Sequence, residues 1–148
     1  MKKLFLILIF IITLFSLLIY SIYIKHEDSI NQACINHVCF DVELAQTEKE
    51  RSEGLMYRSF LDEEEGMLFI FREEGIYPFW MKNTLISLDI IWINKEMKIV
   101  YIERNTPPCK TEICNTYSPK KSAVYVLEIN GELSKKYNFN EGDEVKLQ

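Results

Sequence analysis

An uncharged, strongly apolar run near the start of the chain sets the first limit on how the chain folds. Leu4 to Ile24 contains 21 residues without a charged side chain. As an α-helix rising ~1.5 Å per residue, such a run spans roughly the 30 Å hydrocarbon core of a bilayer. A cleaved signal peptide has a shorter apolar core, about 7–15 residues, followed by small residues. We therefore expect residues 1–24 to form an uncleaved signal-anchor transmembrane helix that contacts lipid through residues 4–24.

The charges on either side of this run predict its orientation. The N-terminal amine, Lys2 and Lys3 precede the run, whereas the lysine that follows it is accompanied by two acids. Positively charged flanks tend to stay in the cytoplasm. We expect a single-pass protein of the cell membrane with its N-terminus in the cytoplasm. Residues 25–36 would form a polar stalk, and residues 37–148 would form one extracytoplasmic domain.

The net charge of the chain argues against one class of partner. The formal charge is −5, and without Lys2 and Lys3 the remainder carries 15 basic against 22 acidic side chains, a balance of −7. Non-specific nucleic-acid binding takes its affinity from cations that neutralise phosphates. We therefore expect no nucleic-acid partner.

Four cysteines fall into two pairs with the same spacing. Cys34 and Cys39, and likewise Cys109 and Cys114, are separated by four residues. Disulfides form in extracytoplasmic compartments, so two local disulfides are the favoured interpretation. A four-thiolate zinc site is the alternative, since this spacing is allowed for zinc without being diagnostic. We expect no metal and no cofactor.

Short strand-like runs separated by turn residues recur throughout the domain. They predict strands over residues 38–45, 66–71, 77–84, 88–94, 98–104, 123–130 and 144–147, with a turn at 72–75. No regular alternation of strands with long helices is present, which argues against a parallel α/β fold. We predict a mainly β (α+β) fold: a small antiparallel β-sandwich or barrel-like domain with one or two short helices.

Two short helices are predicted by local signals. Thr47 and Glu50 have the spacing of a capping box, in which the hydroxyl and the carboxylate satisfy free amides at a helix start. Gly54 is expected to end this helix, after which the chain turns toward the core. Residues 131–137 are expected to form a single helical turn or a short helix.

The best candidate site is the stretch Phe79 to Thr84 together with Asp89. It places a cation, an amide, a hydroxyl and a carboxylate within eleven residues of otherwise apolar sequence. Buried polar groups must be paired or must face a ligand, because burial without partners costs several kcal/mol. As a strand, this stretch would put Trp80, Lys82 and Thr84 on one face and Asn83 on the other. An indole beside an ammonium can hold a planar or anionic ligand.

A purely structural interpretation of these residues remains open. In it, Trp80 packs in the core, Lys82 forms a salt bridge with Asp89, and the following residues form a turn. Arg51 and Arg58 could clamp an anion, or they could form a solvated face near the helix end. Glu128 is a lone acid in an apolar strand, and its structural alternative is a salt bridge at an edge or hairpin.

Four motifs resemble those of a family of uncharacterised domains, DUF192, also known as UPF0127. They are Arg51-x-x-Gly54-Leu55-Met56-x-Arg58, Gly66-Met67-Leu68-Phe69-x-Phe71, Phe79-Trp80-Met81-Lys82-Asn83-Thr84 with Leu88-Asp89, and Leu127-Glu128 followed by Gly142-Asp143. The resemblance implies a compact, mostly β domain that is commonly exported or membrane-anchored. It implies no established activity. A paired-cysteine loop such as Cys109 to Cys114 also resembles the family.

These observations lead to one functional hypothesis and two alternatives. The leading hypothesis is a membrane-anchored binding or accessory domain for a small molecule, a glycan or an envelope protein. The first alternative is a hydrolase or transferase that uses Asp89 or Glu128 as base and Lys82 as electrostatic stabiliser. The second is a structural envelope protein. The candidate ligand-binding residues are Arg51, Arg58, Trp80, Lys82, Asn83, Thr84, Asp89 and Glu128.

Overall fold

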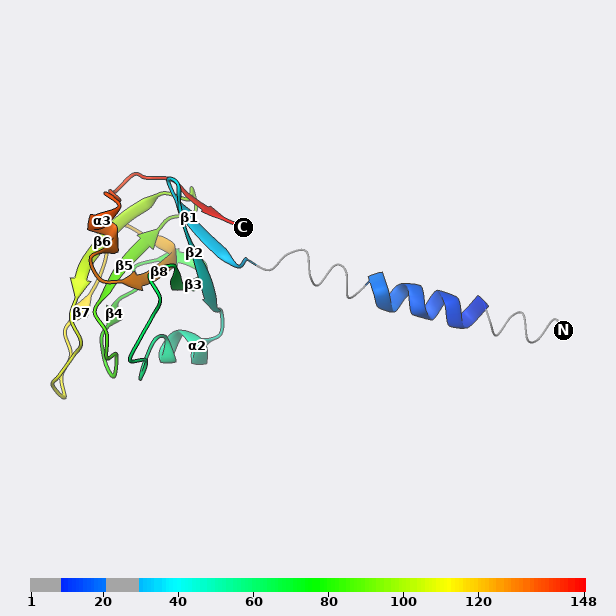
Figure 1. Cartoon of the computed structure of the whole chain (residues 1–148), viewed down its shortest axis with the longest axis horizontal. Coiled ribbons are helices and arrows are strands. Elements are labelled where there is room, and N and C mark those ends of the chain that lie inside the picture. Colours follow the sequence, from blue (N-terminus) through cyan, green and yellow to red (C-terminus); the bar gives the residue numbers. More distant parts are fainter. Residues whose placement is uncertain (1–8, 21–29) are drawn as a thin grey trace.

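The computed structural model describes residues 9–20 and 30–148 (Figure 1). Residues 9–20 are helical with exposed side chains. Within the described ranges, no helix combines the length and the apolar character needed to cross a membrane. The predicted span over residues 4–24 and the predicted stalk both extend into residues outside the description.

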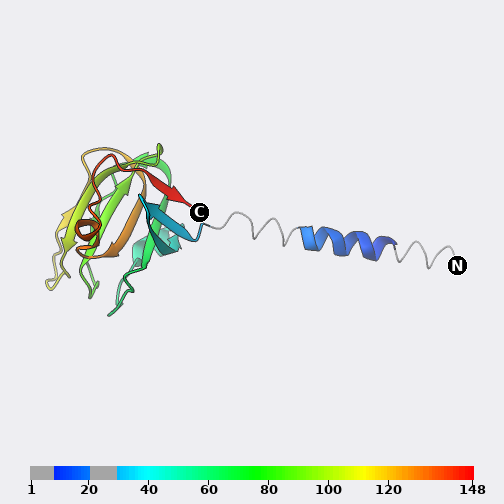
Figure 2. The same ribbon diagram turned by 45° about the horizontal axis from the view of Figure 1, so that its top comes forward.

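The domain is built on one seven-stranded sheet with the order β6-β5-β8-β3-β2-β1-β9. Neighbouring strands are antiparallel except for the parallel pair β2 and β3. The strands are β1 (Gln32–Ile35), β2 (Val38–Ala45), β3 (Glu65–Gly75), β5 (Leu88–Ile93), β6 (Ile99–Thr106), β8 (Ala123–Asn130) and β9 (Val145–Leu147). Figure 2 shows the sheet curling round on itself.

The two ends of the sheet meet and close it into a barrel. The backbone amide of Ile99, where β6 begins, donates to the carbonyl of Asp143 at 3.0 Å, and the amide of Val145 donates to Met97 at 2.8 Å. Closure leaves few strand edges unpaired. The barrel-like alternative of the predicted fold class is therefore the one that forms.

Short elements lie outside the main sheet. A two-stranded ribbon pairs β4 (Phe79–Trp80) with β7 (Thr116–Tyr117). Helix α2 (Glu48–Glu53) has the predicted capping box, with Thr47 as its N-cap and Gly54 as its C-cap. Helix α3 (Leu133–Lys136) confirms the second predicted helical segment.

Two predicted boundaries are wrong. Residues Gln32–Ile35, assigned to the stalk, form β1 between β2 and β9, and Ala33 and Ile35 are fully buried. The predicted turn at 72–75 is instead the continuation of β3 to Gly75. Residues 32–35 form a run too short to show a strand pattern, and three of the four residues at 72–75 are charged. Pairing with other strands nevertheless makes both segments part of the sheet.

Each face of the sheet supports its own hydrophobic cluster. The interior cluster includes Phe40, Leu68 and Ile91, and the outer cluster includes Met67, Phe69 and Trp92. All six residues of β5 are buried because both of its faces are covered. The outer cluster lies under the β4–β7 ribbon and the chain that follows α2, and the candidate site lies in this cover.

Both predicted disulfides are present. The sulfur atoms of Cys34 and Cys39 are 2.10 Å apart, and those of Cys109 and Cys114 are 2.12 Å apart. Cys34 and Cys39 are also register partners of the β1–β2 hairpin. The second disulfide closes a loop between β6 and β7. Among the described residues, no three potential ligands gather in a way that could hold a metal ion.

Candidate functional site

The Phe79 to Thr84 segment crosses the outer cluster as a short strand followed by a turn. Phe79 and Met81 point inward, whereas Trp80 and Lys82 are exposed. The predicted alternation therefore holds as far as Lys82, but the strand ends at Trp80. Asn83 has a φ of 56°, which turns the chain away from strand geometry.

Phe79 and Met81 anchor this segment to the barrel. The Phe79 ring makes edge contacts with Phe69 and Trp92, with centroids 4.8 and 5.8 Å apart. The Met81 side chain is 1% exposed, and its carbonyl accepts from the Cys109 amide at 3.3 Å. The inner residues thus supply the packing that the structural interpretation assigned to Trp80.

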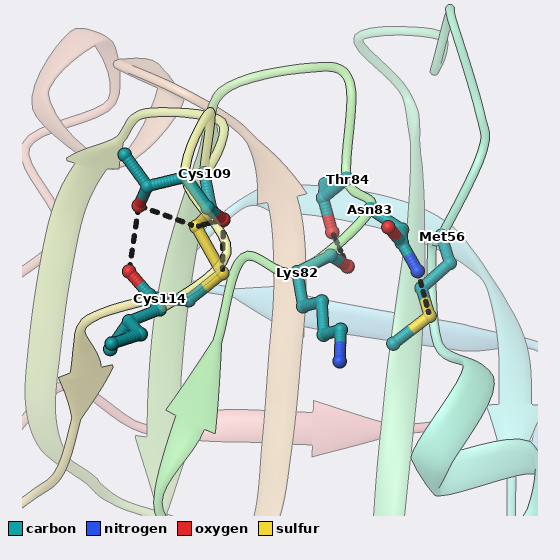
Figure 3. Close-up of a disulfide and its surroundings, with 8 residues drawn as sticks. Met56, Lys82, Asn83, Thr84, Cys109 and Cys114 are labelled. Carbon is teal, nitrogen blue, oxygen red and sulfur yellow. Dashed lines mark hydrogen bonds between the residues drawn. A yellow bond between two sulfur atoms is a disulfide. The ribbon is translucent and has the colours of Figure 1, made fainter.

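Trp80 and Lys82 form an exposed pair on the outer side of this segment. The Lys82 ammonium lies 5.2 Å from the centroid of the Trp80 ring, and the Trp80 residue is 48% exposed to solvent. Figure 3 shows the lysine side chain extending between the Cys109–Cys114 disulfide and Met56 with no hydrogen bond drawn to its amine. The indole face is therefore presented to solvent together with an ammonium that forms no ion pair within residues 30–148.

The turn after Lys82 is held by the chain that follows α2. The Asn83 amide nitrogen donates to the Tyr57 hydroxyl at 2.8 Å and contacts the Met56 sulfur at 3.8 Å (Figure 3). The Tyr57 backbone amide donates to the Asn83 carbonyl at 2.8 Å. Thr84 is buried, and its hydroxyl donates to the Lys82 carbonyl at 3.4 Å. Asn83 and Thr84 therefore shape the turn that presents Lys82.

Glu128 lies beneath this turn in the middle of the sheet. Strand β8 runs between β3 and β5, and Glu128 stands opposite Met67 on one side and Ile90 on the other. The residue is 5% exposed, and burial raises the pKa of its carboxyl to about 8. No group within residues 30–148 forms a hydrogen bond or an ion pair with this carboxyl, so the salt bridge of the structural alternative does not form.

A small pocket connects Glu128 to the surface. Its cavity volume is about 30 Å³, which is room for a small group or a water molecule. The pocket brings together five of the eight candidate residues and several residues that sequence patterns did not indicate. Its lining consists of Arg51, Ser52, Glu53, Gly54, Leu55, Met56, Phe69, Phe79, Trp80, Lys82, Thr84 and Glu128.

Gly54 leaves the space through which Glu128 is reached. Its φ of +46° lies in the left-handed region, where side chains other than glycine are strained. A Cβ at this position would lie 3.1 Å from the Phe69 ring and 4.0 Å from Oε2 of Glu128. The sequence identified Gly54 as the helix end, but only the fold shows that it also borders the pocket.

Arg51 forms the side of the pocket that belongs to α2. Its guanidinium donates to the carbonyls of Gln46 and Ile70, the latter at 3.0 Å, and lies 5.2 Å from the centroid of the Phe71 ring. These contacts fix the helix against β3. Among the described residues, no carboxylate forms an ion pair with Arg51, so its charge remains available beside the pocket.

Arg58 lies outside the pocket and has a structural partner. It binds both carboxylate oxygens of Glu43 at 2.5 Å. This pairing lowers the pKa of Glu43 and raises the pKa of Arg58. The two arginines therefore do not form an anion clamp, which was one of the two alternatives for them.

Asp89 also lies outside the pocket, on the opposite face of the sheet from Glu128. Its register partner is Ile129 of the interior cluster. The carboxylate accepts from the backbone amides of Asn105 at 2.6 Å, Glu132 at 3.0 Å and Ser134 at 2.6 Å. Asp89 thus satisfies the amides at the start of α3, as a capping side chain does. The Lys82–Asp89 salt bridge of the structural interpretation does not form, because backbone amides hold the carboxylate.

The sequence comparison decides the family. The model of the family DUF192, described as Uncharacterized ACR, matches residues 30–147. The chain belongs to the DUF192 family. The predicted resemblance is therefore confirmed for the domain, and the matched range includes β1. No match is found among the curated proteins.

Two solved structures are similar to this DUF192 domain. A protein of unknown function from Novosphingobium aromaticivorans DSM 12444 is 33% identical, with a TM-score of 0.73 over 82% of this chain and 89% of that chain. A protein from Sinorhizobium meliloti 1021, described as a "putative transcription regulator", is 32% identical, with a TM-score of 0.71 over 78% of this chain and 90% of that chain.

Proposed function

We propose that this chain is a membrane-anchored, extracytoplasmic binding module whose ligand site is the pocket above Glu128. The observation that carries the proposal is the Glu128 carboxyl, which is 5% exposed and has no partner among residues 30–148. A buried carboxyl without a partner destabilises the fold by several kcal/mol once it ionises. A ligand group that binds this carboxyl would offset that cost.

The rim of the pocket supports recognition of a ligand larger than the pocket itself. The cavity of about 30 Å³ admits only one end group. The exposed Trp80 ring beside it offers an apolar surface for the remainder of a small molecule, a glycan or a segment of an envelope protein. Asn83 and Thr84 contribute by fixing the turn, whereas Arg58 and Asp89 have no place in this site.

We do not extend the description "transcription regulator" from the Sinorhizobium relative to this chain. The domain carries a balance of −7 without Lys2 and Lys3. Such a charge repels the phosphates on which nucleic-acid binding depends. The expected partners are therefore the lipid bilayer, through residues 4–24, and a ligand outside the cytoplasm.

Titration calorimetry of the full-length protein in detergent tests the proposal. The panel would contain neutral sugars, amines, carboxylates and phosphates. We expect at least one compound to bind the wild type and to bind Lys82→Ala at least tenfold more weakly. Lys146→Ala, which removes an exposed lysine from β9, is the matched control. Equal binding by the wild type and Lys82→Ala across the panel would contradict the proposal.

A second candidate function is catalytic and rests on the raised pKa of Glu128. A carboxyl with a pKa of about 8 is suited to general acid–base chemistry near neutral pH. Lys82 would stabilise negative charge that develops in the transition state. Under this hypothesis, Glu128→Gln loses turnover of a bound compound, whereas a pure binding module converts none. Asp89 has no part in it, because its carboxylate faces away and is held by amides.

A purely structural role makes a different prediction for Lys82. If the segment were only a folding nucleus, Lys82→Ala would lower the melting temperature severely. The exposed, unpaired ammonium contributes little packing, so we expect the variant to melt within a few degrees of the wild type. Thermal denaturation followed by circular dichroism distinguishes the two roles.

A further inference from the structure

The charges that line the Glu128 pocket favour one chemical class of ligand. Arg51 and Glu53 come from α2 and its end, and Lys82 comes from the turn after β4. The neighbouring strands β3 and β5 present only Met67 and Ile90 beside Glu128. The strand environment around the carboxyl is therefore apolar, and the charged groups lie toward the pocket mouth.

Glu128 is a hydrogen-bond donor at neutral pH. Burial alone raises the pKa of its carboxyl to about 8, so the protonated form dominates at pH 7. A protonated carboxyl has one O–H donor. Neither Lys82 nor Arg51 is an ion-pair partner of Glu128, and both cations therefore remain available to a ligand.

We propose, resting on the function proposed above, that the pocket binds ligands through a carboxylate group. The Glu128 carboxyl donates a hydrogen bond to one ligand oxygen, and the Lys82 ammonium pairs with the ligand charge. Arg51, fixed by the Gln46 and Ile70 carbonyls, adds positive potential at the side. Trp80 contacts the apolar part of the ligand that stays outside the cavity.

Other ligand classes fit the pocket less well. Above Glu128 the pocket lining carries Arg51 and Lys82 against the single acid Glu53, so an ammonium group would meet a net positive charge there. A neutral amide or hydroxyl group would use the Glu128 donor but leave the Lys82 charge unused. A carboxylate uses both groups, and charge-assisted hydrogen bonds are roughly twice as strong as neutral ones.

The test uses the full-length protein in detergent and a matched series of probes. Propionate, propionamide and propylamine share a chain and differ in the end group. The readout is the chemical shift of the indole N–H of Trp80. We expect propionate to shift this signal saturably at pH 6.5, with propionamide and propylamine at least tenfold weaker. Lys82→Ala should weaken propionate binding at least tenfold, and Lys82→Arg should retain it.

The pH dependence separates the donor role of Glu128 from simple charge attraction. We expect propionate to bind the wild type at least tenfold more weakly at pH 9 than at pH 6.5, because ionised Glu128 repels the ligand. Glu128→Gln keeps an N–H donor at every pH, so it should bind propionate with little change between the two values. Equal pH dependence in the wild type and Glu128→Gln would overturn the proposal.

Two sources could supply the carboxylate, and a second pair of probes distinguishes them. An acetylated diglycine with a free C-terminus represents a peptide end, and its amide is the control. Tighter binding of the peptide acid than of propionate indicates a protein C-terminus, and the reverse indicates a small carboxylic acid. Preferred binding of propylamine or propionamide would overturn the carboxylate inference while leaving the binding function intact. If no probe and no compound of the calorimetric panel binds, both the carboxylate inference and the proposed binding function are overturned.

Discussion

At the scale of single residues, Glu128 is a buried acid with no ion-pair partner within residues 30–148. It occupies the centre of a sheet face between Met67 and Ile90, where an apolar side chain would pack without desolvation. Its folded-state pKa of about 8 lies well above the ordinary value of 4.5. A raised carboxyl pKa means that the folded protein holds the proton more tightly than the unfolded chain does.

Glu128→Gln is predicted to make stability less dependent on pH. Below pH 4.5 both states bind the proton, and between 4.5 and about 8 only the unfolded state loses it. The free energy of unfolding of the wild type therefore falls as pH rises through this window and levels off above it. One pKa unit corresponds to about 1.36 kcal/mol. Between pH 4.5 and pH 8.5, the free energy of unfolding of Glu128→Gln should therefore rise relative to that of the wild type by on the order of 3–5 kcal/mol.

Urea denaturation of full-length protein at several pH values measures this effect. Glu73→Gln, at an exposed position in β3, is the matched control and should follow the wild type. Parallel pH curves for the wild type and Glu128→Gln would show that the carboxyl has a partner in solution and that the pocket argument is wrong.

Residue types and periodicity predicted which side chains lie together, but they did not predict which groups those side chains bind. The pairing of Trp80 with Lys82 followed from period two and is present at 5.2 Å. The hydrogen-bond partners of Asp89 could not be predicted from periodicity. They are the backbone amides of Asn105, Glu132 and Ser134, which are distant in sequence. Backbone amides carry no sequence signature, so a buried acid held by them looks the same as one held by a cation.

At the scale of elements, the Cys109–Cys114 loop braces the turn that carries Lys82. The Cys109 amide donates to the Met81 carbonyl, next to Lys82 in the chain, and the β4–β7 ribbon joins the same two segments. The other disulfide lies in the β1–β2 hairpin. Neither disulfide contributes a residue to the pocket lining. The two disulfides thus have different relations to the candidate site.

Removing each disulfide separately is predicted to give different outcomes. Either double serine variant should lose about 2 kcal/mol of stability at most, because each loop is short. Cys109→Ser with Cys114→Ser should also speed hydrogen exchange in residues 81–84 and weaken ligand binding. Cys34→Ser with Cys39→Ser should leave both unchanged. Exchange mass spectrometry measures the first effect, and equal exchange in the two variants would contradict the bracing role.

Elements with strong local signals were predicted well from sequence. The capping box of Thr47 and Glu50 and the end at Gly54 define α2 as expected, and β8 matches the predicted run over residues 123–130. Strand β1 was missed because residues 32–35 lack an alternating pattern of sufficient length. It is a strand because β2 and β9 pair with it on both sides.

At the scale of the whole molecule, closure of the barrel depends on contacts that join distant parts of the chain. The parallel pairing of β2 with β3 requires the connection that contains α2, and the β9 end pairs with both β1 and the start of β6. Local patterns predicted a mainly antiparallel sheet but could not choose between a sandwich and a barrel. That choice depends on register and twist accumulated over all strands.

The proposed membrane anchor places this barrel near the bilayer. Residues 25–31 separate the predicted span from β1, which begins at Gln32. Seven residues extend at most roughly 25 Å at ~3.3–3.6 Å each. On the proposed topology, the domain would therefore stay within about its own diameter of the outer surface of the membrane, where it would meet ligands of the cell envelope.

Fractionation and protease protection test this arrangement. We expect the full-length chain to stay with membranes after alkaline carbonate extraction, because residues 4–24 interact with lipid hydrocarbon, and a chain lacking residues 2–24 to remain soluble. In bacterial spheroplasts, protease added outside should digest the domain, since we propose that the positive flank at Lys2 and Lys3 keeps the N-terminus inside. Release by carbonate would contradict the anchor. If the membrane-bound domain were digested only after lysis, the proposed orientation would be reversed. The Glu128 pocket would then face carboxylates of the cytoplasm.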